Sequence, residues 1–195
     1  SLLAAGRLSD RRLLIDLFHQ MAEILAVLHR HGHFIPHLIL NDIMVVRGAD
    51  GQFKIKIDYK LSRFIDPKLD RPAPMLKHLI GCHPDILNQR PLDFRSDIWS
   101  LGKVFVELLS GDLEIGNLEA RVDALDVPDA LAVLLRVMLA DDPDLRPQSM
   151  AEVVSALARI KTQPPQAAAA PARLVQRLQK RVRMLAAVVT VLVLA

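Results

Sequence analysis

Apolar side chains recur every three or four positions along the first part of the chain, between residues 10 and 30. This spacing places them on one face of a helix, and the residues on that face are Leu14, Leu17, Phe18, Met21, Leu25 and Leu28. Gly32 follows them, and glycine ends helices well because it adopts the left-handed conformation without steric cost. The pattern predicts a helix that opens at Ser9 and Asp10 and leads directly into HGHFIPHLILNDIMVV, residues 31–46.

Strict alternation of apolar and polar residues replaces the helical spacing further along. It covers Gln52, Phe53, Lys54, Ile55, Lys56 and Ile57. The apolar run IMVVR, residues 43–47, precedes this segment, and Asp50-Gly51 lies between the two. Because Asp-Gly favours the tight turn of a hairpin, the two segments predict a pair of antiparallel strands.

Prolines interrupt the next part of the chain, residues 63–94, where little periodicity is present. This predicts a long, functional loop. The segment SDIWSLGKVFVELLSG, residues 96–111, is apolar on more than one face, as expected for a helix buried in the middle of a domain. Two more helices are predicted, one from Pro128 and one from Ser149, where Ser149 and Glu152 can form a capping box.

The composition narrows the class of protein. With 195 residues, 51% of them hydrophobic, the chain can fill a core. Its single cysteine, Cys82, excludes an intramolecular disulfide and any zinc site built on several cysteines. Residues 153–195 hold 7 of the 25 Lys and Arg residues, whereas all 22 Asp and Glu residues precede them. Residues 1–152 therefore carry more acidic than basic groups, and nucleic acid is not an expected partner.

The C-terminal part changes character after residue 161. Residues 162–172 form a linker rich in proline and alanine, residues 173–183 a basic juxtamembrane helix, and residues 184–195 an uncharged apolar run. A membrane span needs about 20 apolar residues, so this run is interpreted as the start of a truncated transmembrane helix. An amphipathic or oligomerising helix is the alternative. Basic residues beside a span favour the cytoplasmic side, which predicts a single-pass protein of the inner or plasma membrane with a cytoplasmic domain over residues 1–161.

Six segments then stand out by their order along the chain. They are LHRHG (28–32), IKIDYKLSRF (55–64), HPDIL (83–87), SDIWSLG (96–102), ELLSG (107–111) and LADDPDLRP (139–147). Together they resemble the C-terminal lobe of the eukaryotic-like Ser/Thr protein kinases of bacteria, many of which carry a single membrane span after the kinase domain. The resemblance covers about residues 1–160. It implies an α+β fold, mainly α, with a short β-hairpin and with the N-terminal lobe absent from this chain, its ATP-contacting elements being expected upstream of Ser1.

The catalytic positions depart from the family pattern His-Arg-Asp-Leu-Lys-Pro-x-Asn. Ile35, Pro36 and His37 stand in place of His-Arg-Asp, Ile39 in place of the lysine, and Asp42 in place of the asparagine. Phosphoryl transfer needs a group that orients the substrate hydroxyl and a cation that steadies the phosphoryl group. A neutral His37 could accept a proton near pH 7. The alternative is a position released from catalytic constraint, and Ile39 carries no charge at all.

Metal and nucleotide binding are less clearly lost. Asp58 stands at the aspartate of Asp-Phe-Gly, and Asp58 and Asp42 both offer oxygen ligands of the kind that Mg²⁺ prefers. Lys60 replaces the glycine of that motif and could instead pair with either acid. The resemblance also implies that Met44 forms the floor of an adenine pocket, so Mg-ATP is a candidate cofactor.

Other residues are expected to serve the structure. By the resemblance, Asp97 accepts hydrogen bonds from the backbone of the catalytic loop, and Arg146 pairs with Asp85. Four histidines lie near this loop, at His29, His31, His33 and His37. Their spacing does not imply a common metal ion, so exposed turn residues are expected.

Intact structural segments beside altered catalytic positions predict a membrane-anchored pseudokinase. Such a domain would be a signalling, binding or allosteric module without efficient phosphotransfer. The alternative is a divergent active Ser/Thr kinase that uses Mg-ATP, with His37 or Asp42 in catalysis and Asp58 on the metal. A third hypothesis is a domain that only assembles receptors and binds no nucleotide. Protein signalling partners are expected, and the oligomeric state stays open.

Overall fold

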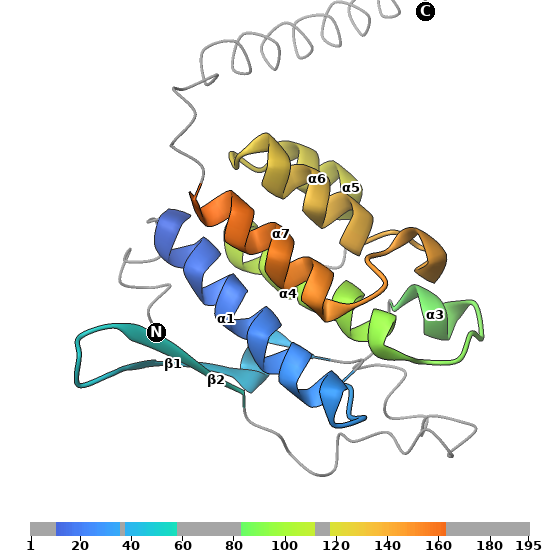
Figure 1. Cartoon of the computed structure of the whole chain (residues 1–195). Coiled ribbons are helices and arrows are strands. Elements are labelled where there is room, and N and C mark those ends of the chain that lie inside the picture. Colours follow the sequence, from blue (N-terminus) through green and yellow to red (C-terminus); the bar gives the residue numbers. More distant parts are fainter. Residues whose placement is uncertain (1–10, 36–37, 58–82, 112–117, 163–195) are drawn as a thin grey trace, which may run out of the picture. The chain divides into compact units, whose positions relative to one another are not determined.

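The computed structural model describes residues 11–35, 38–57, 83–111 and 118–162, all of which belong to the first of two units, Ser1–Thr162 and Gln163–Ala195. Helices dominate this part of the chain, and its strands form one two-stranded sheet (Figure 1). The helices are α1 (Arg11–Arg30), α3 (Pro84–Leu87), α4 (Phe94–Ser110), α5 (Leu118–Ala124), α6 (Asp129–Met138) and α7 (Met150–Thr162). The strands are β1 (Ile43–Arg47) and β2 (Phe53–Ile57), and Leu40–Asp42 and Pro143–Leu145 form short 3-10 turns. The predicted α+β class, mainly α with a hairpin, is confirmed.

The core forms where α1, α4, α6 and α7 pack together. Figure 1 shows α7 between α1 and α6, with α4 behind it, and residues of these helices contact one another. The predicted apolar face of α1 is buried, except for the half-buried Leu28. At its centre Phe18 stacks on Phe105 of α4, with ring centroids 3.7 Å apart and an interplanar angle of 6°. Burying each phenylalanine contributes about 1.5–3 kcal/mol to the stability of this core.

Helix α4 has sequence signals at both ends. The side chain of Asp93 accepts a hydrogen bond from the Arg95 amide at 2.7 Å, and the Ser96 hydroxyl accepts one from the Asp93 amide at 3.2 Å, which completes a capping box. Gly111 ends the helix with φ at +68°, the left-handed conformation that favours glycine. The helix begins at Phe94, two residues earlier than predicted, and is buried without a break from Ser96 to Gly102, as its apolar pattern indicated.

The hairpin lies against α1 and has the predicted antiparallel strands. Val45 pairs with Ile55, and Met44 pairs with Lys56. Gln20 on α1 fixes β2 by two hydrogen bonds: its Nε2 donates to the Phe53 carbonyl and its Oε1 accepts from the Ile55 amide, both at 3.1 Å. The alternation of residues 52–57 is thereby explained, because Ile55 faces the core and the lysines face outward.

Two helices were missed in the sequence, and the others were found. The predicted loop over residues 63–94 is wrong at α3, while residues 63–82 lie outside the described residues. Helix α5 was not predicted at all. Helix α7 begins close to Ser149, whose hydroxyl accepts from the Glu152 amide at 3.3 Å. The return bond of a capping box goes instead from the Gln148 amide to Glu152, at 3.1 Å.

Candidate functional site

The loop after α1, which the sequence resemblance aligns with a kinase catalytic loop, is anchored where it leaves the helix. Gly32 has φ at +76°, and the amide of His33 returns to the carbonyl of Leu28 at 3.0 Å, so the helix ends in a tight turn. The chain then enters the core at Ile35 and again at Leu38, which are 7% and 2% exposed. Pro36 and His37, between these two anchors, lie outside the described residues.

Asp97 in the first turn of α4 holds this loop by its backbone. The Ile35 amide lies 2.7 and 2.8 Å from the two carboxylate oxygens of Asp97, and His29 Nε2 lies 2.8 Å from one of them. Asp97 is fully buried. Burial raises the pKa of Asp97 above its usual value, because the interior disfavours the charge, and the bonds from His29 and Ile35 offset only part of this effect. The hydrogen bond from the loop backbone to Asp97, expected from the resemblance, is therefore present. The buried carboxylate of Asp97 is stabilised by its two partners, Ile35 and His29.

His29 is not an exposed turn residue, contrary to the expectation for the four histidines. Its side chain is only 10% exposed and bonds to Asp97 from the last turn of α1. The ring lies 4.8 Å from the ring of Phe94, which in turn makes an edge contact with Phe34 at 5.6 Å. His31 and His33 are exposed, as expected. The sequence does not reveal the bond from His29 because its partner is 68 residues away in the chain.

Asp42 lies at the end of the same loop, in the turn Leu40–Asp42. It is 4% exposed, and its carboxylate accepts a hydrogen bond from the Ile39 amide at 3.3 Å. The second predicted metal ligand, Asp58, lies outside the described residues, as does Lys60. Within the described ranges no group of three or more His, Cys, Asp or Glu side chains is placed to hold a metal ion. A carboxylate such as that of Asp42 is a ligand that Mg²⁺ prefers. The metal site formed by Asp42 and Asp58 stays a prediction.

Met44 and Ile39 are the residues that the sequence resemblance assigns to the adenine floor and to the catalytic lysine position. Met44 is 47% exposed on β1, on the outward face of the hairpin beside Lys56. Ile39 is half-buried and its side chain carries no charge. Both assignments stay predictions.

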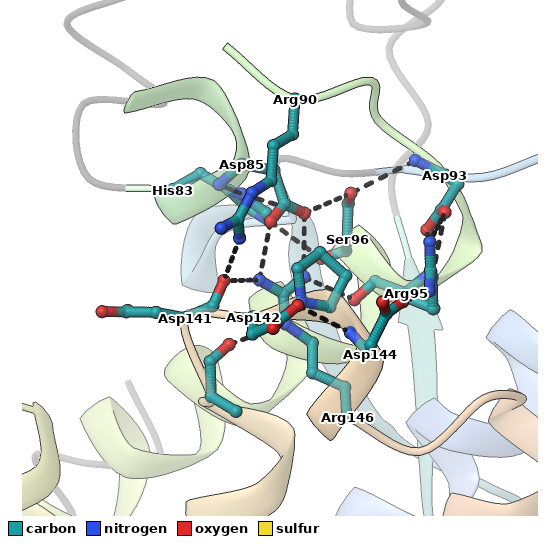
Figure 2. Close-up of polar contacts among 12 residues, drawn as sticks. His83, Asp85, Arg90, Asp93, Arg95, Ser96, Asp141, Asp142, Asp144 and Arg146 are labelled. Carbon is teal, nitrogen blue, oxygen red and sulfur yellow. Dashed lines mark hydrogen bonds and ion pairs between the residues drawn. The ribbon is translucent and has the colours of Figure 1, made fainter. Parts of the chain in front are cut away.

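A second polar cluster joins α3, the start of α4 and the turn before α7 (Figure 2). Arg146 donates two hydrogen bonds to Asp85, at 2.8 and 2.7 Å, and both side chains are buried. The Ser96 hydroxyl donates to the same carboxylate at 2.8 Å. Burial alone would raise the pKa of Asp85, but the bonds from Arg146 and Ser96 outweigh it and lower the pKa. The pairing implied by the resemblance is therefore present as a two-bond, buried ion pair.

His83 completes this cluster and was not singled out in the sequence. Its Nδ1 accepts from the Asp85 amide at 3.2 Å and its Nε2 lies 3.1 Å from the Ser96 carbonyl, so the hydrogen is on Nε2 and the ring is neutral. The Trp99 ring packs on it, with centroids 4.5 Å apart. Burial lowers the pKa of His83 to about 4, because a charged imidazole is disfavoured in this interior. Pro84 at the first position of α3 is typical of a helix start, but histidine is not among the residues that usually cap one, so the sequence alone does not indicate the role of His83.

Similar proteins identify the class of domain that this geometry forms. No protein-family profile matches the chain. Over 140 residues it is 25% identical to Serine/threonine-protein kinase A of Synechocystis sp., an alignment that covers 63% of this chain and 27% of that protein. Over 94 residues it is 35% identical to the death-associated protein kinase dapk-1 of Caenorhabditis elegans, covering 45% of this chain and 6% of the kinase. It is also 34% identical over 101 residues to a titin homolog of the same organism, covering 49% of this chain and, after rounding, 0% of that protein.

These similarities and the fold agree. The chain contains a kinase-like domain, and its described helices and hairpin form an α+β lobe of the C-terminal kind, with no N-terminal lobe among the described residues. It is related to protein kinases, of which it spans only a minor part of the length.

Proposed function

We propose that this kinase-like domain is a pseudokinase, a binding or allosteric module in signalling that does not transfer phosphate efficiently. One observation supports the proposal above the others. Asp97 and His29 still hold the backbone of the loop at Ile35, while the loop positions that would act on a phosphoryl group carry His37 and Ile39. The fold of the loop is thus maintained without the groups that its chemistry requires.

The chemical reason lies in the transition state of phosphoryl transfer. Negative charge is spread over the transferred group, and enzymes stabilise it with metal ions and cations held in position. Ile39 cannot supply such a charge. An imidazole at position 37 is larger than a carboxylate, and once protonated it no longer accepts the substrate proton. Both substitutions act against catalysis, whereas binding of a protein partner requires a folded surface and no catalytic group.

Membrane attachment is the second part of the proposal. It is supported by the uncharged run over residues 184–195, the basic residues 173–183 before it, and the linker 162–172. These segments lie outside the described residues, and none of the described helices is both long and apolar enough to span a bilayer. The proposed protein is single-pass, with residues 1–161 on the cytoplasmic side.

The test is a phosphotransfer assay with labelled ATP and Mg²⁺ on the full-length protein, which includes the N-terminal lobe expected upstream of Ser1, beside thermal unfolding with and without nucleotide. The expected result is no incorporation of label above that of His37→Ala and Asp58→Ala variants, together with recovery of a protein partner by pull-down. Incorporation that His37→Ala abolishes would establish a divergent active kinase and refute the proposal. A Mg-ATP-dependent rise in Tm that Asp58→Ala removes, without transfer, would identify a nucleotide-binding pseudokinase.

A further inference from the structure

A shallow groove runs between α6 and α7, on the side of the domain away from the hairpin. Its volume is about 450 Å³, and Leu134 of α6 together with Pro147, Ala151 and Ala156 forms its apolar lining. Figure 1 shows α6 and α7 side by side along this face. Its lining does not include residues of the loop held by Asp97, and at one end Pro147 directly follows Arg146 in the chain.

The margin of the groove on α6 is apolar and exposed. Val133 and Val137 are 56% and 39% exposed, and they lie four residues apart on one face of the helix. The two valines do not line the groove itself, but Val137 is three residues from Leu134, which does, so this face adjoins the groove. Scattered exposed valines are ordinary, but a continuous apolar face beside a groove is typical of an interaction site.

The charges along α7 identify the kind of partner. Glu152 and Arg159 both line the groove, seven residues apart, which is about 10 Å along a helix. Among the described residues, no side chain or carbonyl accepts a hydrogen bond from the Arg159 guanidinium or pairs with it. Among the described residues, the Glu152 carboxylate bonds to the start of its own helix, through Gln148 and Ser149. The midpoint between the two charges lies between Ser155, which is exposed, and Ala156, which is half-buried.

This arrangement is self-complementary. If two α7 helices lay antiparallel about a twofold axis between Ser155 and Ala156, Glu152 of each copy would face Arg159 of the other. A twofold interface requires this property, since each residue that contacts a second one must also be contacted by it. An unrelated partner would not require opposite charges at equal distances on either side of one point along the helix.

We propose that a second copy of this chain docks in the groove, forming a twofold dimer through α6 and α7. The apolar lining, with Val133 and Val137, provides the buried area, and the two Glu152–Arg159 pairs fix the antiparallel orientation. The proposed dimer uses a face other than the loop on which the proposed pseudokinase function rests. The test of the dimer measures association alone. The dimer proposal can therefore fail while the pseudokinase proposal holds, and the pseudokinase proposal can fail while the dimer proposal holds.

The experiment uses the full chain in detergent and in membranes. Analytical ultracentrifugation is expected to show a monomer–dimer equilibrium that Glu152→Arg or Arg159→Glu weakens at least about tenfold, because like charges then meet twice in each dimer. The double variant Glu152→Arg/Arg159→Glu is expected to restore association to near that of the unaltered chain. If a single charge reversal weakened association by damaging the fold, a second reversal would add to the damage and would not restore association.

Cross-linking tests the position of the axis. In a Cys82→Ser background, Ser155→Cys is expected to form a disulfide-linked dimer on oxidation, whereas Glu119→Cys, exposed on α5, is not. A chain that stays monomeric at all concentrations, association that both single charge reversals leave unchanged, or equal cross-linking at residues 119 and 155 would each overturn the proposal. A further outcome would also overturn the proposal: a chain that is monomeric, and in which Arg159→Glu increases hydrogen exchange in the groove. That result would show that another segment of the same chain covers the groove.

Discussion

Acidification should destabilise the kinase-like domain through one residue, His83. The ring is 2% exposed and both of its nitrogens are engaged, Nδ1 with the Asp85 amide and Nε2 with the Ser96 carbonyl. A proton on Nδ1 would replace the acceptor that the Asp85 amide needs. The folded state therefore resists protonation, and the pKa of His83 falls from 6.5 to about 4.

The sign and size of the effect follow from this difference. The unfolded chain takes up the proton at a higher pH than the folded chain, so the contribution is fully present above pH 6.5 and is lost as the pH falls towards 4. A difference of about 2.5 in pKa corresponds to about 3 kcal/mol when both states are fully titrated. Between pH 7 and pH 5 the expected loss is about 2 kcal/mol in the free energy of unfolding.

Urea unfolding of the full chain, followed by fluorescence, measures this loss. Trp99 is the single tryptophan of the chain and its ring lies 4.5 Å from His83, so the signal reports on the site itself. His83→Ala should be less stable at pH 7, because two hydrogen bonds and buried packing are lost, but should lose about 2 kcal/mol less than the unaltered chain on going to pH 5. His33→Ala, at an exposed histidine, is the matched control. If His83→Ala keeps the full difference between pH 7 and pH 5, the reasoning is refuted.

Two further predictions concern stability and use the same unfolding measurement. Arg146→Ala leaves the buried Asp85 carboxylate without its charged partner and should cost about 3–5 kcal/mol, whereas Arg136→Ala, which breaks the exposed pair with Asp123, should cost at most about 1 kcal/mol; equal costs would contradict the assigned role of the buried pair. Gln89 has φ at +54° and is exposed, so Gln89→Gly should raise the free energy of unfolding by about 1 kcal/mol. Asn88→Gly, one residue earlier at φ −90°, should not stabilise the protein, and a gain there as large as at Gln89 would refute the explanation from backbone strain.

The sequence predicted the elements in which the hydrophobic pattern repeats over several helical turns or several strand residues. The face of α1 that includes Phe18 and Met21, and the alternation around Ile55, each contain enough periods to fix both the type of element and the side that is buried. Helix α5 was missed because it has seven residues, of which only Val122 is buried, so it shows no periodicity. The early start of α4 was missed although Asp93 and Ser96 form a capping box three residues apart, a signal available in the sequence.

The candidate site was less accessible to sequence reasoning than the helices. Positions in motifs indicated Asp97, Asp85 and Arg146 through the family resemblance. The partners His29 and His83 have no periodic or compositional signal, since their roles arise from residues 68 and 13 positions away. Contacts of this kind depend on packing in three dimensions, and a histidine in a turn has the same local sequence whether it is exposed or bonded to a buried acid.

Gln20 affects how readily the edge of the hairpin can pair with a strand of another molecule. The carbonyl of Phe53 and the amide of Ile55 already bond to its side chain, so these two groups on β2 cannot accept or donate to an additional strand. Unpaired strand edges recruit strands from other molecules and promote aggregation. The side-chain amide of Gln20 thus occupies the hydrogen-bonding groups that a third strand would use at this part of the edge. This disfavours aggregation by addition of strands from other molecules.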